Sequence, residues 1–147
     1  MPHNGELVSA LDGDWGPTAQ KIEAKVKQKA QESGVDLSSA AVQQAAQDSV
    51  RAIMLIRAYR VRGHLAAQLD PLAMENKDTQ PELDPASYGF TASDMDRRIF
   101  IDGYLGLDYA TIPEMVDILK RTYCSTIGVE FQHISNPVEK AWLQERI

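Results

Sequence analysis

The first candidate for a functional site in this sequence is a short stretch that holds four basic residues. Arg57, Arg60, Arg62 and His64 follow one another within the segment 57–64. Cationic groups at this density could bind an anion or a carboxylate. Cations near a helix C-terminus also offset the helix dipole and pair with acidic residues nearby, and the sequence favours this structural role.

A glycine interrupts the basic stretch. Gly63 stands between Arg62 and His64. Glycine at such a place indicates a sharp turn or a close approach of another part of the backbone, because it has no Cβ atom. We therefore expect a corner at Arg62-Gly63-His64.

The single cysteine and two of the histidines are the other candidates for chemistry. A closed zinc site needs four ligands, and the sequence has neither a Cys-x-x-Cys nor a His-x-x-x-His pair. Cys124 could find a base only in His64 or His133, and no spacing brings them together. We expect Cys124 to be a buried, inert thiol and His133 a hydrogen-bonded core residue. No catalytic, cofactor-binding or metal-binding residue is predicted.

A long helix must carry the basic stretch. Neither glycine nor proline occurs between Gly34 and Gly63, and Ser38 or Ser39 can cap the helix start. One helix of about seven turns is expected. Its middle, residues 52–56, is apolar on every side, which predicts burial all round.

A long acidic loop follows the helix. Asp70 precedes Pro71, which disfavours helical angles and ends the helix at or before that point. Residues 70–90 hold three prolines and five acidic residues against Lys77. This loop is longer than the connections usual in compact domains. Its length predicts either a strap that covers other parts of the structure or a functional loop.

Helix start and stop signals mark the remaining elements. Residues 18–33 form a charged helix with one thin apolar stripe, which Gly34 ends. Capping-box patterns and a proline in the first helical turn predict three further helices. These are a short helix from Thr91 through Phe100, one from Thr111 to near Tyr123, and one from Asn136 with Trp142 facing inward.

In one segment the apolar residues recur at every second position, which is typical of a β-strand. Residues 129–133 place Val129, Phe131 and His133 on one side. A lone strand cannot pair with itself, so the segment is an extended strap or needs a sheet partner. The expected fold is mainly α, with about five helices, one of them long and buried, one strand-like segment and a long acidic loop. We expect a tail or linker over 1–17, a peripheral helix over 18–34 and a helical region over 35–147.

Composition narrows the function classes. The 147 residues are 44% hydrophobic and 24% charged, as in folded domains. A net charge of −6 argues against nucleic acid as a partner. The longest apolar run is too short to cross a bilayer, and no secretory signal or transit peptide is visible. A single cysteine suits a reducing compartment, the bacterial cytoplasm or, in a eukaryote, the mitochondrial matrix.

Several motifs together resemble the N-terminal region of the 2-oxoglutarate dehydrogenases. Asp70, Pro71 and Tyr123 belong to these motifs, as do His133 and the corner. Gln68, Ala73 and Gln132 depart from the usual family residues Asn, Gly and Met. The resemblance covers roughly residues 40–147, and residues 4–13 are similar to alphaproteobacterial versions. The matching runs are residues 56–64, 69–72, 121–134 and 139–147.

The resemblance implies an enzyme that decarboxylates 2-oxoglutarate with thiamine diphosphate and magnesium. The succinyl group then passes to lipoyl groups on a dihydrolipoyl succinyltransferase core, and the parent enzyme is a homodimer. The family's cofactor motif, Gly-Asp-Gly followed by paired asparagines, does not occur here. The resemblance therefore implies an internal piece of a longer enzyme, inactive alone, which binds no cofactor itself.

Three hypotheses remain open at this point. The chain scaffolds the rest of its own enzyme, or it is an autonomous helical interaction module without catalytic activity. In the third, the segment 57–64 binds an anionic regulator. Cooperative melting of the isolated chain favours the module, and a molten, aggregating chain favours the fragment.

Overall fold

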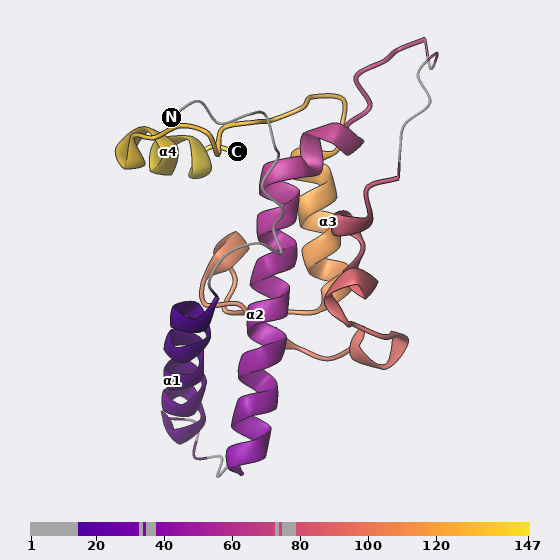
Figure 1. Ribbon diagram of the computed structural model, residues 1–147. Coiled ribbons are helices and arrows are strands. Elements are labelled where there is room, and N and C mark those ends of the chain that lie inside the picture. Colours follow the sequence, from indigo (N-terminus) through magenta and orange to yellow (C-terminus); the bar gives the residue numbers. More distant parts are fainter. Residues whose placement is uncertain (1–14, 33, 35–37, 73, 75–78) are drawn as a thin grey trace.

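The computed structural model is mainly α-helical, as predicted. Helix α1 (Gly16–Glu32) lies beside the long helix α2 (Ser39–Arg62), and α3 (Ile112–Tyr123) packs against α2 as well (Figure 1). Helix α4 (Pro137–Gln144) stands apart from this group, near one end of α2. The structure describes residues 15–32, 34, 38–72, 74 and 79–147, so most of the expected tail lies outside the described residues.

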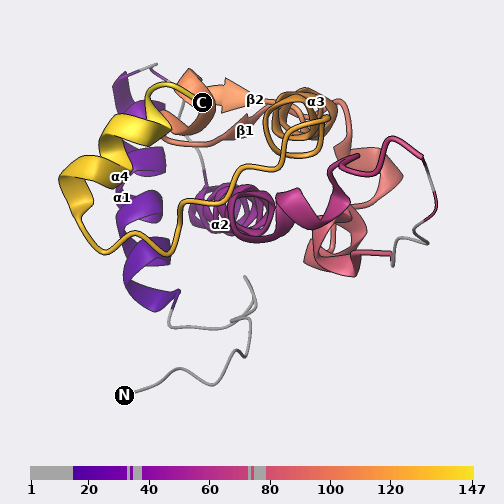
Figure 2. The same cartoon turned by 90° about the horizontal axis from the view of Figure 1, so that it is seen from above.

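Helix α2 is the central element of the fold, as Figure 2 shows by looking nearly down its axis. Ser38 caps its start, since the Ser38 hydroxyl accepts a hydrogen bond of 3.2 Å from the Ala41 backbone N–H. The helix runs for 24 residues. Ala52, Leu55 and Ile56 are fully buried, which confirms the prediction of a long helix with a buried middle.

Two buried clusters surround α2. The larger one joins α2 to α3, to the loop 81–90 and to a small sheet. Helix α3 contributes Ile112, Met115 and Leu119 from one face, and Thr111 and Glu114 form the predicted capping box at its start. The smaller cluster lies between α1 and α2. The long helix is thus packed on several sides.

A hairpin replaces one predicted helix. Thr91 and Asp94 do form a capping box, but it closes a single 3-10 turn, η4 (Ala92–Asp94). Strand β1 (Ile99–Phe100) then pairs antiparallel with β2 (Tyr109–Ala110). The predicted helix through Phe100 is wrong, because burial of Ile99 and Phe100 in an extended conformation overrides the local helix signal.

The segment 128–134 is an irregular strap, and the strands of the described residues lie elsewhere. A turn bonds the Ile134 N–H to the Phe131 carbonyl at 3.1 Å, which breaks the alternation of sides. Phe131 is buried, but the His133 side chain is 68% exposed, so its prediction as a core residue is wrong. Trp142 is also 54% exposed rather than packed inward.

Candidate functional site at the end of the long helix

Gly63 lies where α2 meets the end of α3. Its own φ of −57° and ψ of −33° are helical, and the backbone departs from helical geometry at Arg62, with φ −123° and ψ −3°, where α2 gives way to the 3-10 turn η1 (Gly63–Ala66). A Cβ atom added to Gly63 would lie 2.6 Å from the Cβ of Tyr123, closer than such atoms approach in proteins. The sequence predicts that this glycine allows either a sharp turn or the close approach of another segment. The structure shows the close approach, and the segment is the end of α3.

The residues on either side of Gly63 link the corner to two other segments. The Arg62 Nε atom lies 3.4 Å from Glu82 in the acidic loop, and both side chains are only 19% exposed. The His64 Nε2 atom lies 3.9 Å from a carboxylate oxygen of Glu130 in the strap. The basic residues here therefore pair with acidic residues, as the structural interpretation expects.

The chain that leaves the corner packs against the strap. The Gln68 backbone N–H donates a hydrogen bond of 2.7 Å to the Ser125 carbonyl. A Cβ atom on Gly128 would lie 3.3 Å from a methyl carbon of Leu69 and 3.4 Å from the His64 Cβ. Motif residues that are some sixty positions apart in the sequence are thus in contact.

Asp70 organises the turn at the start of the acidic loop. Its two carboxylate oxygens accept hydrogen bonds from the backbone N–H groups of Leu72, at 2.9 Å, and Met74, at 2.6 Å. An aspartate that bonds its own following backbone is a common way to fix a turn around proline, here Pro71. Asp70 therefore stabilises the turn in which it lies.

The structure brings four of the seven predicted motif residues together. Arg62, Gly63, His64 and Tyr123 meet at the corner, whereas the hydrogen bonds of Asp70 are to the backbone of its own turn around Pro71. His133 lies on the surface of the strap, 3.9 Å from Glu130. The corner is therefore a junction at which the end of α2 packs against the end of α3.

A surface cleft of about 520 Å³ opens beside this junction, between α2, α3 and the acidic loop. Cys124 lines it and is partly exposed, not buried as predicted, together with Lys120 one helical turn earlier. Sequence reasoning did not single out Lys120, although its spacing of four from Cys124 places both on one helix face. Asp84, also at the cleft, accepts a hydrogen bond of 2.9 Å from the Ala86 N–H. The cleft lining therefore holds a thiol and an amine, with no histidine among its residues.

Two buried tyrosines donate hydrogen bonds to backbone carbonyls of the acidic loop, Tyr59 from α2 and Tyr88 from within the loop itself. The Tyr59 hydroxyl donates a hydrogen bond of 3.0 Å to the Leu83 carbonyl, and the Tyr88 hydroxyl donates one of 2.9 Å to the Glu82 carbonyl. Burial raises the pKa of Tyr59 to about 12 and that of Tyr88 to about 12, from 10.0 in each case.

These pKa shifts predict a loss of stability in alkali. Groups with a raised folded-state pKa contribute their full stabilisation below the unfolded pKa and lose it as the pH rises towards the folded pKa. Urea unfolding at a series of pH values should show stability falling between pH 10 and 12. A Tyr59→Phe, Tyr88→Phe variant should show a flatter decline. An equal slope for the two proteins would contradict this assignment.

Within the described residues, no group of three or more His, Cys, Asp or Glu side chains is arranged to hold a metal ion. A search of the helices in the same residues finds none with the length and hydropathy needed to span a bilayer.

Comparison with known proteins confirms the resemblance read from the motifs. The chain is 60% identical over 151 aligned residues to the 2-oxoglutarate dehydrogenase E1 component of Brucella anthropi. It is 59% identical to the proteins of the same name from Brucella ovis and Brucella melitensis. Each match covers 98% of this chain and 15% of the relative, so the chain spans about 15% of the length of these curated relatives. No family model matches the chain.

Proposed function

We propose that this chain, which matches 2-oxoglutarate dehydrogenase E1 components, is a segment of such an enzyme and supports its structure without carrying out its chemistry. The observation that carries the proposal is the packed corner. Its motif residues contact one another, as Gly63 does Tyr123 and Arg62 does Glu82. They leave no nucleophile and base in contact.

The parent enzyme would decarboxylate 2-oxoglutarate with thiamine diphosphate and Mg²⁺, and pass the succinyl group to a lipoyl group. The residues of this chain do not fit that cofactor. The sequence lacks the Gly-Asp-Gly motif with paired asparagines, and the described residues form no metal-binding cluster. The residues that hold the cofactor are therefore proposed to lie in other parts of the parent.

Exposed apolar side chains support a role within a larger protein. Leu72 in the acidic loop, Ile127 just before the strap and Val138 in α4 are 74%, 69% and 75% exposed. Ile134, Val138, Trp142 and Leu143 line an apolar groove of about 420 Å³. Apolar surfaces of this kind mark contacts between proteins or domains. We propose that they contact the remainder of the enzyme.

The resemblance extends the proposal to location and assembly. The parent would be a homodimer bound to a dihydrolipoyl succinyltransferase core in the bacterial cytoplasm, with nucleic acid and membranes excluded as partners. The acidic net charge of −6 and the single cysteine agree with this placement.

A second function has its own supporting observation. The chain has two buried clusters around α2, which is what independent folding requires. An autonomous helical interaction module would use the same exposed apolar residues to bind a different protein. Cooperative melting together with saturable binding of another protein would favour this second function.

The proposal is tested by measuring carbon dioxide release from 1-¹³C-labelled 2-oxoglutarate by mass spectrometry. The purified chain with thiamine diphosphate and Mg²⁺ should release no more labelled gas than a heat-denatured sample. The Brucella anthropi protein serves as the positive control. Release by the chain alone, in proportion to its concentration, would refute a purely supporting role.

A further inference from the structure

Part of the basic stretch is left unpaired by the corner. Arg57 and Arg60 are three residues apart, so they lie on one face of α2. Ile53, one turn earlier on that face, is buried between α1 and α2. We call Arg57, Arg60 and the two aromatic residues that they cover the arginine face.

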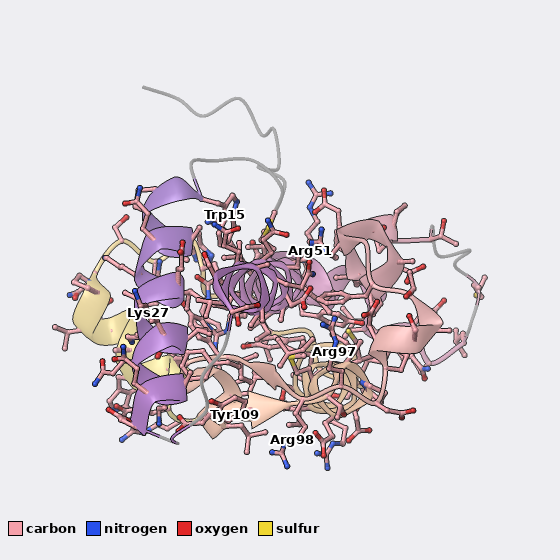
Figure 3. The ribbon with its side chains drawn as sticks, turned by 90° about the horizontal axis from the view of Figure 1, so that it is seen from below. Trp15, Lys27, Arg51, Arg97, Arg98 and Tyr109 are labelled. Atoms are coloured by element: carbon pink, nitrogen blue, oxygen red, sulfur yellow. The ribbon has the colours of Figure 1, made fainter. Side chains whose placement is uncertain are left out.

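Aromatic rings hold the two guanidinium groups in place. The Arg57 guanidinium carbon lies 5.5 Å from the ring centre of Trp15, at the start of α1, and Figure 3 shows Trp15 beside α2. The corresponding carbon of Arg60 lies 5.4 Å from the ring centre of Tyr104. Stacking fixes the plane of a guanidinium group and leaves its N–H edge free to bind a planar anion.

The arginine face has donors without acceptors. The Arg60 Nε and Trp15 Nε1 atoms are buried and have no hydrogen-bond partner among the described residues. Both atoms can only donate. By contrast, Arg97 in the loop before β1 pairs with both Asp48 and Asp94 at 2.7 Å. Among the described residues, no carboxylate forms a salt bridge with Arg57 or Arg60, whose side chains are exposed and partly exposed.

The turn that carries Tyr104 is strained. Asp102 and Leu105 have φ values of 52° and 59°, a region that residues other than glycine rarely adopt. Lys25 of α1 fixes the turn through hydrogen bonds of 2.7 Å and 2.6 Å to the two carboxylate oxygens of Asp102. Strain of this kind persists where the surrounding structure enforces it, often at binding sites. Here it places Tyr104 against Arg60.

The surface favours a polypeptide over a small molecule. Arg57 is exposed and Arg60 partly so, and neither lines the cleft beside the corner or the apolar groove at α4. Small ligands prefer enclosed pockets. Arginine, tryptophan and tyrosine are the residue types that dominate binding energy in protein interfaces. Carboxylates pair with arginine through two parallel hydrogen bonds.

We propose that the arginine face docks an acidic polypeptide segment, with aspartate or glutamate carboxylates accepting from the guanidinium groups of Arg57 and Arg60. This inference does not depend on the proposed role in 2-oxoglutarate dehydrogenase. It assigns an interaction surface distinct from the apolar groove at α4. Its occupant is identified by charge, since the surface offers donors and few acceptors.

The test uses a fluorescently labelled ten-residue glutamate peptide and the purified chain, with binding followed by fluorescence anisotropy at low salt. An Arg57→Gln, Arg60→Gln variant should bind the peptide at least tenfold more weakly. The matched control, Arg121→Gln, Arg146→Gln, removes the same charge from exposed positions and should bind within twofold of the original chain. Circular dichroism checks that both variants fold.

Three results would overturn the proposal. The first is no saturable binding of the peptide, and the second is an equal loss in the control variant. The third is displacement of the peptide by inorganic phosphate or ATP at the concentration at which unlabelled peptide displaces it, which would show a site for small anions.

Discussion

Replacing Gly63 by alanine is expected to lower the free energy of unfolding of the chain by about 2–3 kcal/mol. The new methyl group would lie 2.6 Å from the Cβ of Tyr123, an atom next to the backbone that cannot rotate away. Either α2 or α3 must shift, and the fully buried Tyr59 and Leu119 side chains around them would lose contacts. Urea unfolding followed by circular dichroism measures the change.

A second glycine provides the control. A methyl group on Gly128 would lie 3.3 Å from the end of the Leu69 side chain, which can move. Gly128→Ala should therefore cost much less than Gly63→Ala. If the two variants are equally stable, or if Gly63→Ala is as stable as the original chain, the close approach of α2 and α3 at this corner is wrong.

Replacing Asp48 by alanine is expected to cost about 2 kcal/mol, the second largest effect. Asp48 is 3% exposed and lies on α2. Its carboxylate accepts from Gln44 at 3.1 Å and lies 2.7 Å from Arg97, while Arg51 is 3.6 Å away. Figure 3 shows Arg51 and Arg97 in this region. In the variant, Arg97 would still pair with Asp94 and is 43% exposed to solvent. Both facts limit the loss in the free energy of unfolding.

An exposed ion pair gives the comparison for Asp48. Asp117 pairs with Arg121 at 3.1 Å, with side chains 68% and 72% exposed. Such surface pairs contribute little, so Asp117→Ala should change stability by less than about 0.5 kcal/mol. Equal effects of the two substitutions in urea unfolding would mean that Asp48 does not join α2 to the loop before β1.

Local signals predicted those parts of the fold that local chemistry controls. Ser38, Thr111 and Asn136 cap helices as expected, because each side chain satisfies backbone N–H groups that the helix leaves unpaired. The importance of Gly63 could be predicted because glycine destabilises a helix, so its presence in a helical pattern indicates a structural requirement. The identity of its contact, Tyr123, depends on long-range packing and was not predictable.

The failures share a cause in tertiary structure. The capping box at Thr91 forms, but the pairing of Ile99 and Phe100 with β2 ends any helix after one turn. His133 follows a turn that the alternating pattern does not reveal. The burial of Asp48 escaped notice because an acidic residue in a helix is ordinarily exposed, and its partner Arg97 is distant in sequence.

The central claim, that this chain supports an enzyme without contacting its substrate, is tested most directly in a chimera. This chain would replace the matching segment of the Brucella anthropi protein, with and without Gly63→Ala, and melting temperature and KM for 2-oxoglutarate would be measured on both. The account predicts a lower melting temperature for the variant and the same KM below that temperature. A changed KM at an unchanged melting temperature would contradict it.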